Sequence, residues 1–369
     1  MRIRSVDFRI IDLPLVRPFR TSFGTQVDRR ILVAAVNTED GFTGWSECVA
    51  MTEPLYSSEY LFECFDIIKR FFLPALFSQG DFRAEQIPLI LAPFLGHPMA
   101  KATIETACLD AELRRERKSL ASFLGAVKSK VECGVSVGIA SSIPALVDEV
   151  TGYVQEGYRR IKLKIEPGWD LEPVAKIREL FPEIPLQVDA NQAYKRSDGK
   201  HLAQLDQFNL LLIEQPLDEH DILGHAQLAE MTKTPICLDE SIISLQSAQD
   251  AIAMGATSVI NIKPGRAGGY LESKRIHDYC QEVSIPVWCG GMLETGIGRA
   301  ANVALAALPG FTLPGDTSAS SRYYKRDVTT PFEMKDGYLD VPTGEGIGVL
   351  PDLEFLESIT SERETIKAL

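Results

Sequence analysis

The sequence predicts an α/β fold in which a parallel sheet closes into a barrel, joined to a smaller α+β domain. Three observations predict it: the length, a regular alternation of short apolar runs with helical segments, and a charged residue at the end of one run after another. With 369 residues, the chain exceeds one average domain of roughly 100 to 200 residues and suits a barrel with a smaller partner. Its 45% hydrophobic and 24% charged residues are typical of globular proteins, which excludes a disordered or fibrous chain.

The first third of the chain has the pattern of an α+β domain. Residues 1 to about 50 alternate polar and apolar side chains, as strands do, with the clearest runs at 32–36 and 42–47 around a turn at 39–41. From about residue 60 to 124 the apolar residues instead take the spacing of helices. We therefore predict an α+β capping domain over residues 1–128.

The middle of the chain alternates strand-like runs with helical segments. Eight runs are candidate strands: 133–139, 160–165, 185–188, 210–213, 235–238, 259–262, 286–289 and, more weakly, 311–313. Segments between them, such as 171–180, 245–254 and 272–282, have helical periodicity. A repeated β-then-α unit favours a parallel sheet closed into a barrel over residues 129–327, with an open doubly wound sheet as the alternative.

The end of the chain returns to turn-rich, strand-like sequence. After about residue 330 the clearest strand-like segment is 337–342, Gly-Tyr-Leu-Asp-Val-Pro. We expect residues 328–369 to pack back on the capping domain.

Charge and cysteine usage limit the partners and the compartment. The formal net charge of −13 repels phosphate backbones and anionic lipids, so we expect neither nucleic acid nor a membrane as a partner. The seven cysteines are scattered without a CxxC pair, which is typical of reduced thiols. Residues 1–15 lack the apolar core of a signal peptide, and the longest apolar stretch, 300–308, is too short for a membrane span. These features together predict a cytoplasmic protein.

Charged residues end five successive runs of the predicted barrel. They are Lys164, Asp189, Glu214, Asp239 and Lys263, at intervals of 25, 25, 25 and 24 residues. One βα unit fits each interval, and the carboxyl ends of barrel strands form one mouth. We therefore expect these five side chains to converge.

The three carboxylates predict a metal site. Acids on neighbouring strands, about 4.8 Å apart, repel one another unless a cation lies between them. Because no Cys or His occupies these positions, the ligands are all oxygen, which favours Mg²⁺, with Mn²⁺ as a substitute, over zinc. Any one of these acids alone is more often a helix N-cap or a surface charge, but three in phase with the βα repeat make that interpretation poor.

The lysines predict acid–base chemistry. Lys162 and Lys164 are two residues apart on one strand, so both point to the barrel interior. Crowding, burial and a nearby metal all lower the pKa of a lysine, which suits Lys164 to act as a base, and Lys263 would face it across the site. The alternative, that each lysine forms a salt bridge with a neighbouring acid, is compatible with catalysis in the empty enzyme.

Removal of a proton α to a carboxylate needs this equipment. That proton is weakly acidic, and a cation on the carboxylate oxygens stabilises the enediolate formed when it leaves. A different class, a Schiff-base aldolase, also uses lysines at strand ends but gives the three acids no role.

Several motifs resemble a known family. They are Lys162-Leu163-Lys164, Asp189-Ala190-Asn191, Glu214-Gln215-Pro216, Leu238-Asp239-Glu240-Ser241 and Lys263-Pro264-Gly265-Arg266. Together they resemble the enolase superfamily, in its muconate-lactonizing-enzyme-like subgroup. The segments 290–298 and 313–320 look like the o-succinylbenzoate synthase and N-succinylamino acid (N-acylamino acid) racemase family. The resemblance covers nearly the whole chain and implies a modified TIM (β/α)7β barrel with an α+β capping domain.

The resemblance also implies residue roles. Asp189, Glu214 and Asp239 would bind Mg²⁺, and Lys164 and Lys263 would be the acid/base pair. The implied substrate-binding residues are Lys162, Asn191, Ser136, Gly291, Met292, Phe19 and Tyr56. Arg266 and Glu240 would modulate the site; a guanidinium near Lys263 would disfavour its ammonium form and so favour racemisation, although a loop arginine is by default a solvated charge.

The resemblance further predicts the setting of the reaction. It implies a small-molecule carboxylate substrate, a homo-oligomer, and a mobile loop over residues 17–28 that covers the barrel mouth. The reactions are dehydration of 2-succinyl-6-hydroxy-2,4-cyclohexadiene-1-carboxylate in menaquinone biosynthesis, N-succinylamino acid racemisation, or both. The alternatives are a dipeptide epimerase or another muconate-lactonizing-like cycloisomerase. Asp316 is followed by Thr317 and Ser318 instead of completing an Asp-x-Asp pair, which disfavours the epimerase.

Overall fold

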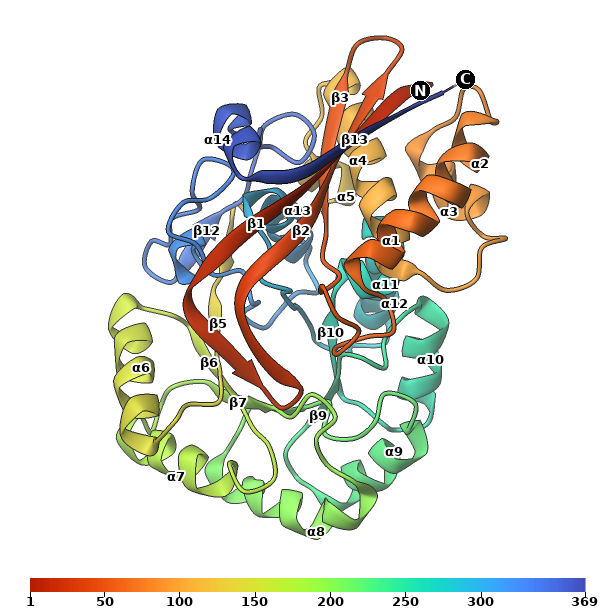
Figure 1. The fold of residues 1–369 in the computed structure, drawn as a ribbon. Helices are drawn as coiled ribbons and strands as arrows, with labels where there is room; N and C mark the ends of the chain where they lie inside the picture. The colour runs from red at the N-terminus through yellow and green to blue at the C-terminus, as the bar shows by residue number, and fades with distance from the viewer. Residues whose placement is uncertain (369) are drawn as a thin grey trace.

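An antiparallel sheet of four strands forms the upper part of the molecule in Figure 1. The structure is a computed structural model that describes residues 1–368. The strand order is β13-β1-β2-β3, with β1 (Ile3–Thr21), β2 (Gly24–Thr38), β3 (Thr43–Cys48) and β13 (Thr360–Lys367). The two predicted runs near residues 32 and 42 are therefore strands, and the turn between them lies where the sequence predicts it.

Helices cover one face of this sheet. They are α1 (Leu61–Ile67), a π-helical turn η1 (Ile68–Phe72), α2 (Leu73–Phe77), a 3₁₀ turn η2 (Ala84–Gln86), α3 (Ile87–Ile90), α4 (Pro98–Glu116) and α5 (Leu120–Leu124). Helix α4 packs closely on β3, because a Cβ added at Gly44 would lie 2.0 Å from the carbonyl oxygen of Ala107. Only glycine permits this approach.

Seven parallel strands form the second sheet, in the order of the chain. They are β5 (Gly134–Val137), β6 (Arg160–Lys164), β7 (Leu186–Asp189), β8 (Ile213–Glu214), β9 (Ile236–Leu238), β10 (Val259–Ile262) and β11 (Val287–Cys289). The eighth predicted run, 311–313, makes an isolated parallel bridge at Phe311 to Val287 of β11, and Gly315, two residues after the run, makes another to Cys133, directly before β5. This segment therefore joins the last strand to the first. Consecutive order without a switch point excludes the doubly wound alternative and confirms the barrel.

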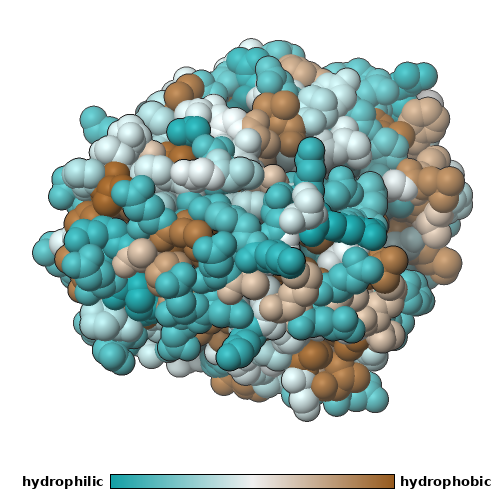
Figure 2. All heavy atoms as spheres, turned by 90° about the horizontal axis from the view of Figure 1, so that it is seen from below, coloured by the Kyte–Doolittle hydropathy of each residue, from teal (hydrophilic) through white to brown (hydrophobic). Residues whose placement is uncertain are grey.

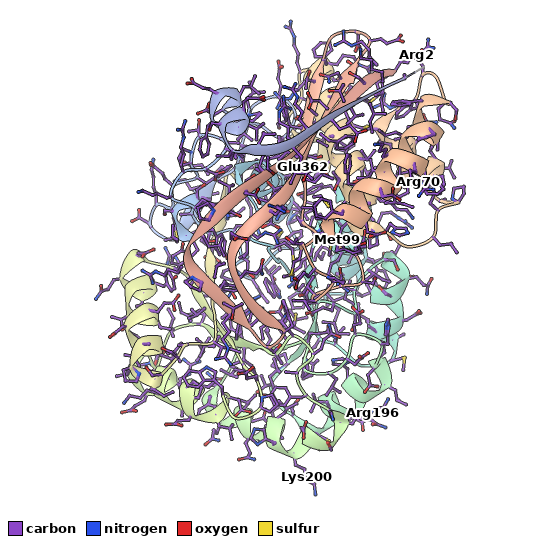
Figure 3. All side chains as sticks on the ribbon, in the orientation of Figure 1. Arg2, Arg70, Met99, Arg196, Lys200 and Glu362 are labelled. Carbon is purple, nitrogen blue, oxygen red and sulfur yellow. The ribbon has the colours of Figure 1, made fainter. Side chains whose placement is uncertain are left out.

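Helices surround the parallel strands on the outside (Figure 1). They are α6 (Ile143–Glu156), α7 (Leu171–Leu180), η3 (Arg196–Asp198), α8 (Gly199–Leu202), η4 (Ala203–Phe208), α9 (Ile222–Met231), α10 (Leu245–Ala253), α11 (Pro264–Ala267), α12 (Tyr270–Glu282), α13 (Gly296–Ala306) and η5 (Ser320–Arg322). Arg196 and Lys200 mark the outer rim, far from the strand ends (Figure 3). The predicted segments at 171, 245 and 272 are thus helices that turn an apolar face to the sheet.

The C-terminal segment returns to the first sheet through a strand that the sequence did not reveal. The predicted segment 337–342 contains β12 (Tyr338–Asp340), but it pairs with β4 (Lys130–Glu132) and not with the N-terminal sheet. After α14 (Leu353–Ser358), β13 pairs antiparallel with β1, and the end of β13 lies close to the start of β1 (Figure 1). Strand β13 is a mostly exposed edge strand, so it lacks the apolar alternation that identifies strands. The domain boundaries at 128 and 327 stay predictions.

The hairpin of β1 and β2 extends from the first sheet to the mouth of the barrel. Residues 17–28, expected as a loop, are the paired ends of these two strands, here called the hairpin tip. The carbonyl of Arg20 accepts from Ile139 N at 2.9 Å, and Ser22 Oγ donates to the carbonyl of Ala190 at 3.1 Å. An ion pair at 2.8 Å joins Arg20 to Glu166. The tip therefore lies against the strand ends where the predicted site residues are found.

The surface in Figure 2 is mostly hydrophilic, with separate hydrophobic areas. Within residues 1–368, no helix combines the length and the hydropathy needed to cross a membrane. All seven cysteines are buried and unpaired.

Candidate active site

The five predicted strand-end residues lie at one end of the parallel sheet. Lys164, Asp189 and Glu214 are the last residues of β6, β7 and β8 and stand side by side in register. Asp239 and Lys263 directly follow β9 and β10. All five side chains are buried. The βα repeat therefore brings them together because parallel neighbours end at the same edge.

Each predicted base is paired with a different acid. Lys164 Nζ donates to Asp189 Oδ2 at 2.5 Å and to Asn191 Oδ1 at 2.6 Å. Lys263 Nζ donates to Asp239 Oδ2 at 2.6 Å. The structure thus contains the salt bridges that the sequence left as an alternative.

A small cavity lies between the two bases. It has a volume of about 50 Å³, and both Lys164 and Lys263 line it. The predicted substrate residues that also line it are Phe19, Tyr56, Asn191, Gly291 and Met292. Two ammonium groups from strands on different sides of the acid cluster therefore face one space.

Lys162 and Ser136 lie deeper in the barrel, outside this cavity. Lys162 Nζ is 3.2 Å from Asp189 Oδ2, 3.0 Å from Glu214 Oε2 and 2.8 Å from Asp316 Oδ2. Ser136 is the register partner of Lys162 on β5, and its buried hydroxyl has no hydrogen-bond partner. Lys162 therefore contacts Asp189 and Glu214 from the barrel interior, on the side away from the cavity.

Sequence reasoning missed several residues of this cluster. Arg160 Nη1 donates to Asp316 Oδ1 at 2.9 Å, and Asn261 Nδ2 donates to Glu214 Oε1 at 2.8 Å. Trp288 forms the floor, with its ring centroid 4.7 Å from Lys162 Nζ. Arg160 precedes Lys162 by two residues on β6, and Asn261 precedes Lys263 by two residues at the end of β10, so this spacing could have identified them. No local sequence pattern predicts that Asp316 is the partner of Arg160.

Charge–charge interactions outweigh burial in this cluster. Burial alone disfavours the ammonium of Lys263, but the Asp239 carboxylate raises the pKa of Lys263 well above its ordinary value. Carboxylates likewise outweigh burial at Lys162 and raise its pKa, the reverse of what crowding of two lysines predicts.

The acids respond differently to the same surroundings. Burial favours the neutral form of Asp189, but the ammonium groups of Lys164 and Lys162 outweigh it and hold the pKa of Asp189 below its usual range. For Glu214, burial and then the charge of Asp189 raise the pKa well above the ordinary value. The acid cluster is thus short of positive charge at Glu214.

Arg266 is not a solvated charge. It is buried, its guanidinium lies 5.2 Å from the centroid of the Tyr56 ring, and it donates to Glu219 at 2.7 Å and to the backbone carbonyl of Glu240. The Tyr56 ring also lies 4.8 Å from Lys263 Nζ. Tyr56 thus contacts both cations. The side chain of Glu240 accepts from Asn191 Nδ2 at 2.9 Å.

The predicted acids fit a hard divalent cation. Asp239 Oδ1 is buried and accepts no hydrogen bond, and the buried Glu214 Oε2 contacts the ammonium Nζ of Lys162 at 3.0 Å. Buried carboxylate oxygens without donors suit ligation, and an all-oxygen set suits Mg²⁺ or Mn²⁺. Among residues 1–368, the group whose possible ligand atoms all lie within 4.8 Å of one another is Glu59, Glu63 and His97, beside α1 and α4, and it does not include the three predicted acids.

Comparisons with known proteins match both parts of the chain. Residues 5–125 match the mandelate racemase/muconate lactonizing enzyme N-terminal domain, and residues 145–355 match the enolase C-terminal domain-like family. The N-succinylamino acid racemase of Amycolatopsis sp. is 57% identical, covering 98% of this chain and 99% of the relative. The o-succinylbenzoate synthase of Geobacillus kaustophilus is 44% identical, covering 98% and 96%.

A solved structure agrees along the whole length. The crystal structure of an enolase superfamily member from Listeria innocua has a TM-score of 0.96 at 40% identity and covers 100% of both chains. The relatives named above are enzymes. The strand-end cluster, the two matched domains and these relatives agree, and the chain belongs to the mandelate racemase/muconate lactonizing enzyme family of the enolase superfamily.

Proposed function

We propose that this protein removes the proton α to the carboxylate of a small molecule, as an o-succinylbenzoate synthase, an N-succinylamino acid racemase, or both. The observation that carries the proposal is that Lys164 and Lys263 line one cavity. Relatives at 57% and 44% identity bear these two names, which supports the substrate class.

Magnesium is the cofactor of this proposal, with manganese as a substitute. The family is one of metal-dependent enzymes, and Asp189, Glu214 and Asp239 would hold the ion. A bound divalent ion supplies positive charge to the substrate carboxylate when the α-proton leaves. Lys162, below the acids, and Asn191, beside Lys164, would keep the carboxylates and the base in position.

The lysines move the protons. In racemisation one lysine takes the α-proton and the other returns a proton to the opposite face, so the substrate changes hand and the two lysines exchange protonation states. In the synthase reaction Lys164 takes the α-proton and then gives it to the departing hydroxyl, which leaves as water. Lys263 stays an ammonium there and stabilises the negative charge that forms.

The residues around the two lysines would contact the substrate or orient the site. Phe19, Tyr56, Gly291 and Met292 line the cavity and would contact the acyl chain, and Ser136 lies deeper. Arg266 would act on Lys263 through the Tyr56 ring, which both cations contact. Glu240 would orient Asn191 by accepting its side-chain hydrogen bond.

The cavity between the lysines is too small to admit the proposed substrate without movement of the protein. Ligand pockets are usually about 300 to 1,000 Å³, so a cavity of about 50 Å³ is too small for a succinylated amino acid. Phe19 and Phe23 from the hairpin tip line it. Movement of the tip would therefore open the site, in the role expected of residues 17–28.

We also propose a cytoplasmic location, a homo-oligomer and a role in menaquinone biosynthesis. Seven buried, unpaired cysteines support a reducing compartment, the cytoplasm. A homo-oligomer and a role in menaquinone biosynthesis rest on the family resemblance.

The test measures both reactions on the same preparation. Proton NMR in D₂O with N-succinyl amino acids should show α-proton exchange, and a separate assay should follow dehydration of the cyclohexadiene substrate. EDTA should abolish activity and Mg²⁺ should restore it. Exchange of a dipeptide but not of succinylated amino acids would instead support an epimerase, and trapping of an imine by borohydride would support the aldolase.

A further inference from the structure

A carboxylate of the N-terminal domain binds the start of a barrel helix. Glu105, in α4, is 1% exposed, and its Oε1 accepts from Leu271 N at 3.1 Å in the first turn of α12. A Cβ added at Gly269, the residue before α12, would lie 2.0 Å from that oxygen, and its φ of +137° also favours glycine. The barrel chain is thus shaped to receive this carboxylate.

The segment held by Glu105 begins at the base Lys263. Helix α11 follows Lys263, whose carbonyl accepts from Arg266 N at 3.0 Å and from Ala267 N at 3.1 Å. A Cβ at Gly265 would lie 2.3 Å from Val49 Cγ2 of the N-terminal domain. Met99, near the start of α4, lies between the two parts of the molecule (Figure 3). The chain from Lys263 to α12 is therefore seated on the N-terminal domain at both ends.

The other base lacks this support. Lys164 ends β6, and the residues after it meet the N-terminal domain through the exposed ion pair of Glu166 with Arg20 in the hairpin tip. A half-exposed ion pair constrains its partners much less than a buried helix cap does. The two lysines thus differ in how firmly their strand ends are held.

We propose that Glu105 is a positioning residue that holds Lys263 and Arg266 against the cavity from the N-terminal domain. It acts on proton transfer at the face of the substrate served by Lys263 and leaves the face served by Lys164 nearly unchanged. This face selectivity rests on the proposed function; the anchoring of the segment does not.

The same helix provides a matched control. Asp110 is also buried in α4, and its carboxylate accepts from Trp45 N and Ile347 N, each at 2.7 Å. Neither donor belongs to a barrel helix or follows a base. Asp110→Asn therefore perturbs α4 without releasing α12.

The experiment compares Glu105→Leu, Glu105→Gln and Asp110→Asn with the wild type as full-length Mg²⁺-loaded proteins whose folding is checked by circular dichroism. The first readout is hydrogen–deuterium exchange of peptides covering residues 264–274. We expect faster exchange there in Glu105→Leu only, because leucine has no acceptor whereas the amide oxygen of glutamine replaces the carboxylate oxygen. Unchanged exchange in folded Glu105→Leu, or equal acceleration in Asp110→Asn, would overturn the anchoring.

The second readout is α-proton exchange of each enantiomer of an N-succinyl amino acid in D₂O. Lys263→Ala identifies the enantiomer that depends on Lys263. We expect Glu105→Leu to slow that enantiomer by about tenfold and the other by less than about twofold. Equal slowing of both enantiomers would refute the face selectivity. Absence of exchange by the wild type would refute the racemase activity and with it the face selectivity, while leaving the synthase activity to the dehydration assay and the anchoring to the peptide data. If Glu105→Leu does not fold, Glu105→Ala takes its place.

Discussion

Lys162 and Asp316 meet in the barrel interior, with Nζ and Oδ2 2.8 Å apart. The other oxygen of Asp316 accepts from Arg160 at 2.9 Å. One carboxylate therefore forms ion pairs with two buried cations, and these pairs occupy the residue that an epimerase would direct to a substrate amine.

We predict that Asp316→Ala severely impairs the protein. Removal of one partner of a buried ion pair leaves the other charge uncompensated, which typically costs about 3 to 5 kcal/mol. Urea denaturation should show a loss of this order, and kcat/KM should fall by at least about a hundredfold as Lys162 shifts. Asp352→Ala, at an exposed helix cap, is the control and should lose about 1 kcal/mol or less. Wild-type stability in Asp316→Ala would contradict the pairing.

Tyr56 offers a test of contact with the base. Its hydroxyl lies 2.9 Å from Lys263 Nζ and 3.3 Å from Asp239 Oδ2. Tyr56→Phe keeps the ring but removes this partner, and we predict a fall of about tenfold in kcat/KM, since a hydrogen bond to a charged group contributes about 1.5 to 3 kcal/mol. Steady-state kinetics measure it, with Tyr60→Phe at a partly exposed position as the control. Equal kinetics of both variants would show that the hydroxyl has no role.

The hairpin tip should control substrate binding. Arg20→Ala removes the ion pair with Glu166 at 2.8 Å while leaving the two lysines untouched. We predict a KM raised about two- to fivefold with a nearly unchanged kcat, because exposed pairs contribute about 0.2 to 1 kcal/mol. Arg17→Ala is the matched control, since Arg17 is exposed on the same hairpin and the partner of Glu166 is Arg20. A lowered kcat without a change in KM would argue against a closing role.

Glu105 should make stability depend on pH. Burial, outweighing the hydrogen bonds from Leu271 N and Tyr270 N, raises the pKa of Glu105 to about 8, against about 4.3 in an unfolded chain. Between these values the folded protein holds the proton more tightly, so stability falls as pH rises towards the folded pKa. Glu105→Gln cannot ionise, so we predict that its stability relative to the wild type increases by roughly 2.5 kcal/mol between pH 6 and pH 9. Urea denaturation at both pH values measures this, and parallel pH profiles would refute it.

The sequence by itself determined the barrel and the positions of its five charged strand ends. Both follow from local regularities: the βα repeat sets where strands end, and parallel strands of a closed sheet end at one mouth. Asp189, Glu214 and Lys263 could therefore be grouped although they are far apart in the chain. The sequence did not predict the pairing of β13 with β1, because an exposed edge strand has no alternation of apolar residues.

Only the tertiary structure decided which acid each lysine contacts, how the hairpin tip meets the strand ends, and which residues support the site from outside it. Asp316 beneath Lys162 and Glu105 at the start of α12 are contacts across 154 and 166 residues. Such contacts have no period along the chain. They arise when complete helices and strands pack together. At Gly269 the absence of a Cβ makes room for the carboxylate of Glu105, and no pattern in the sequence around Gly269 predicts that contact.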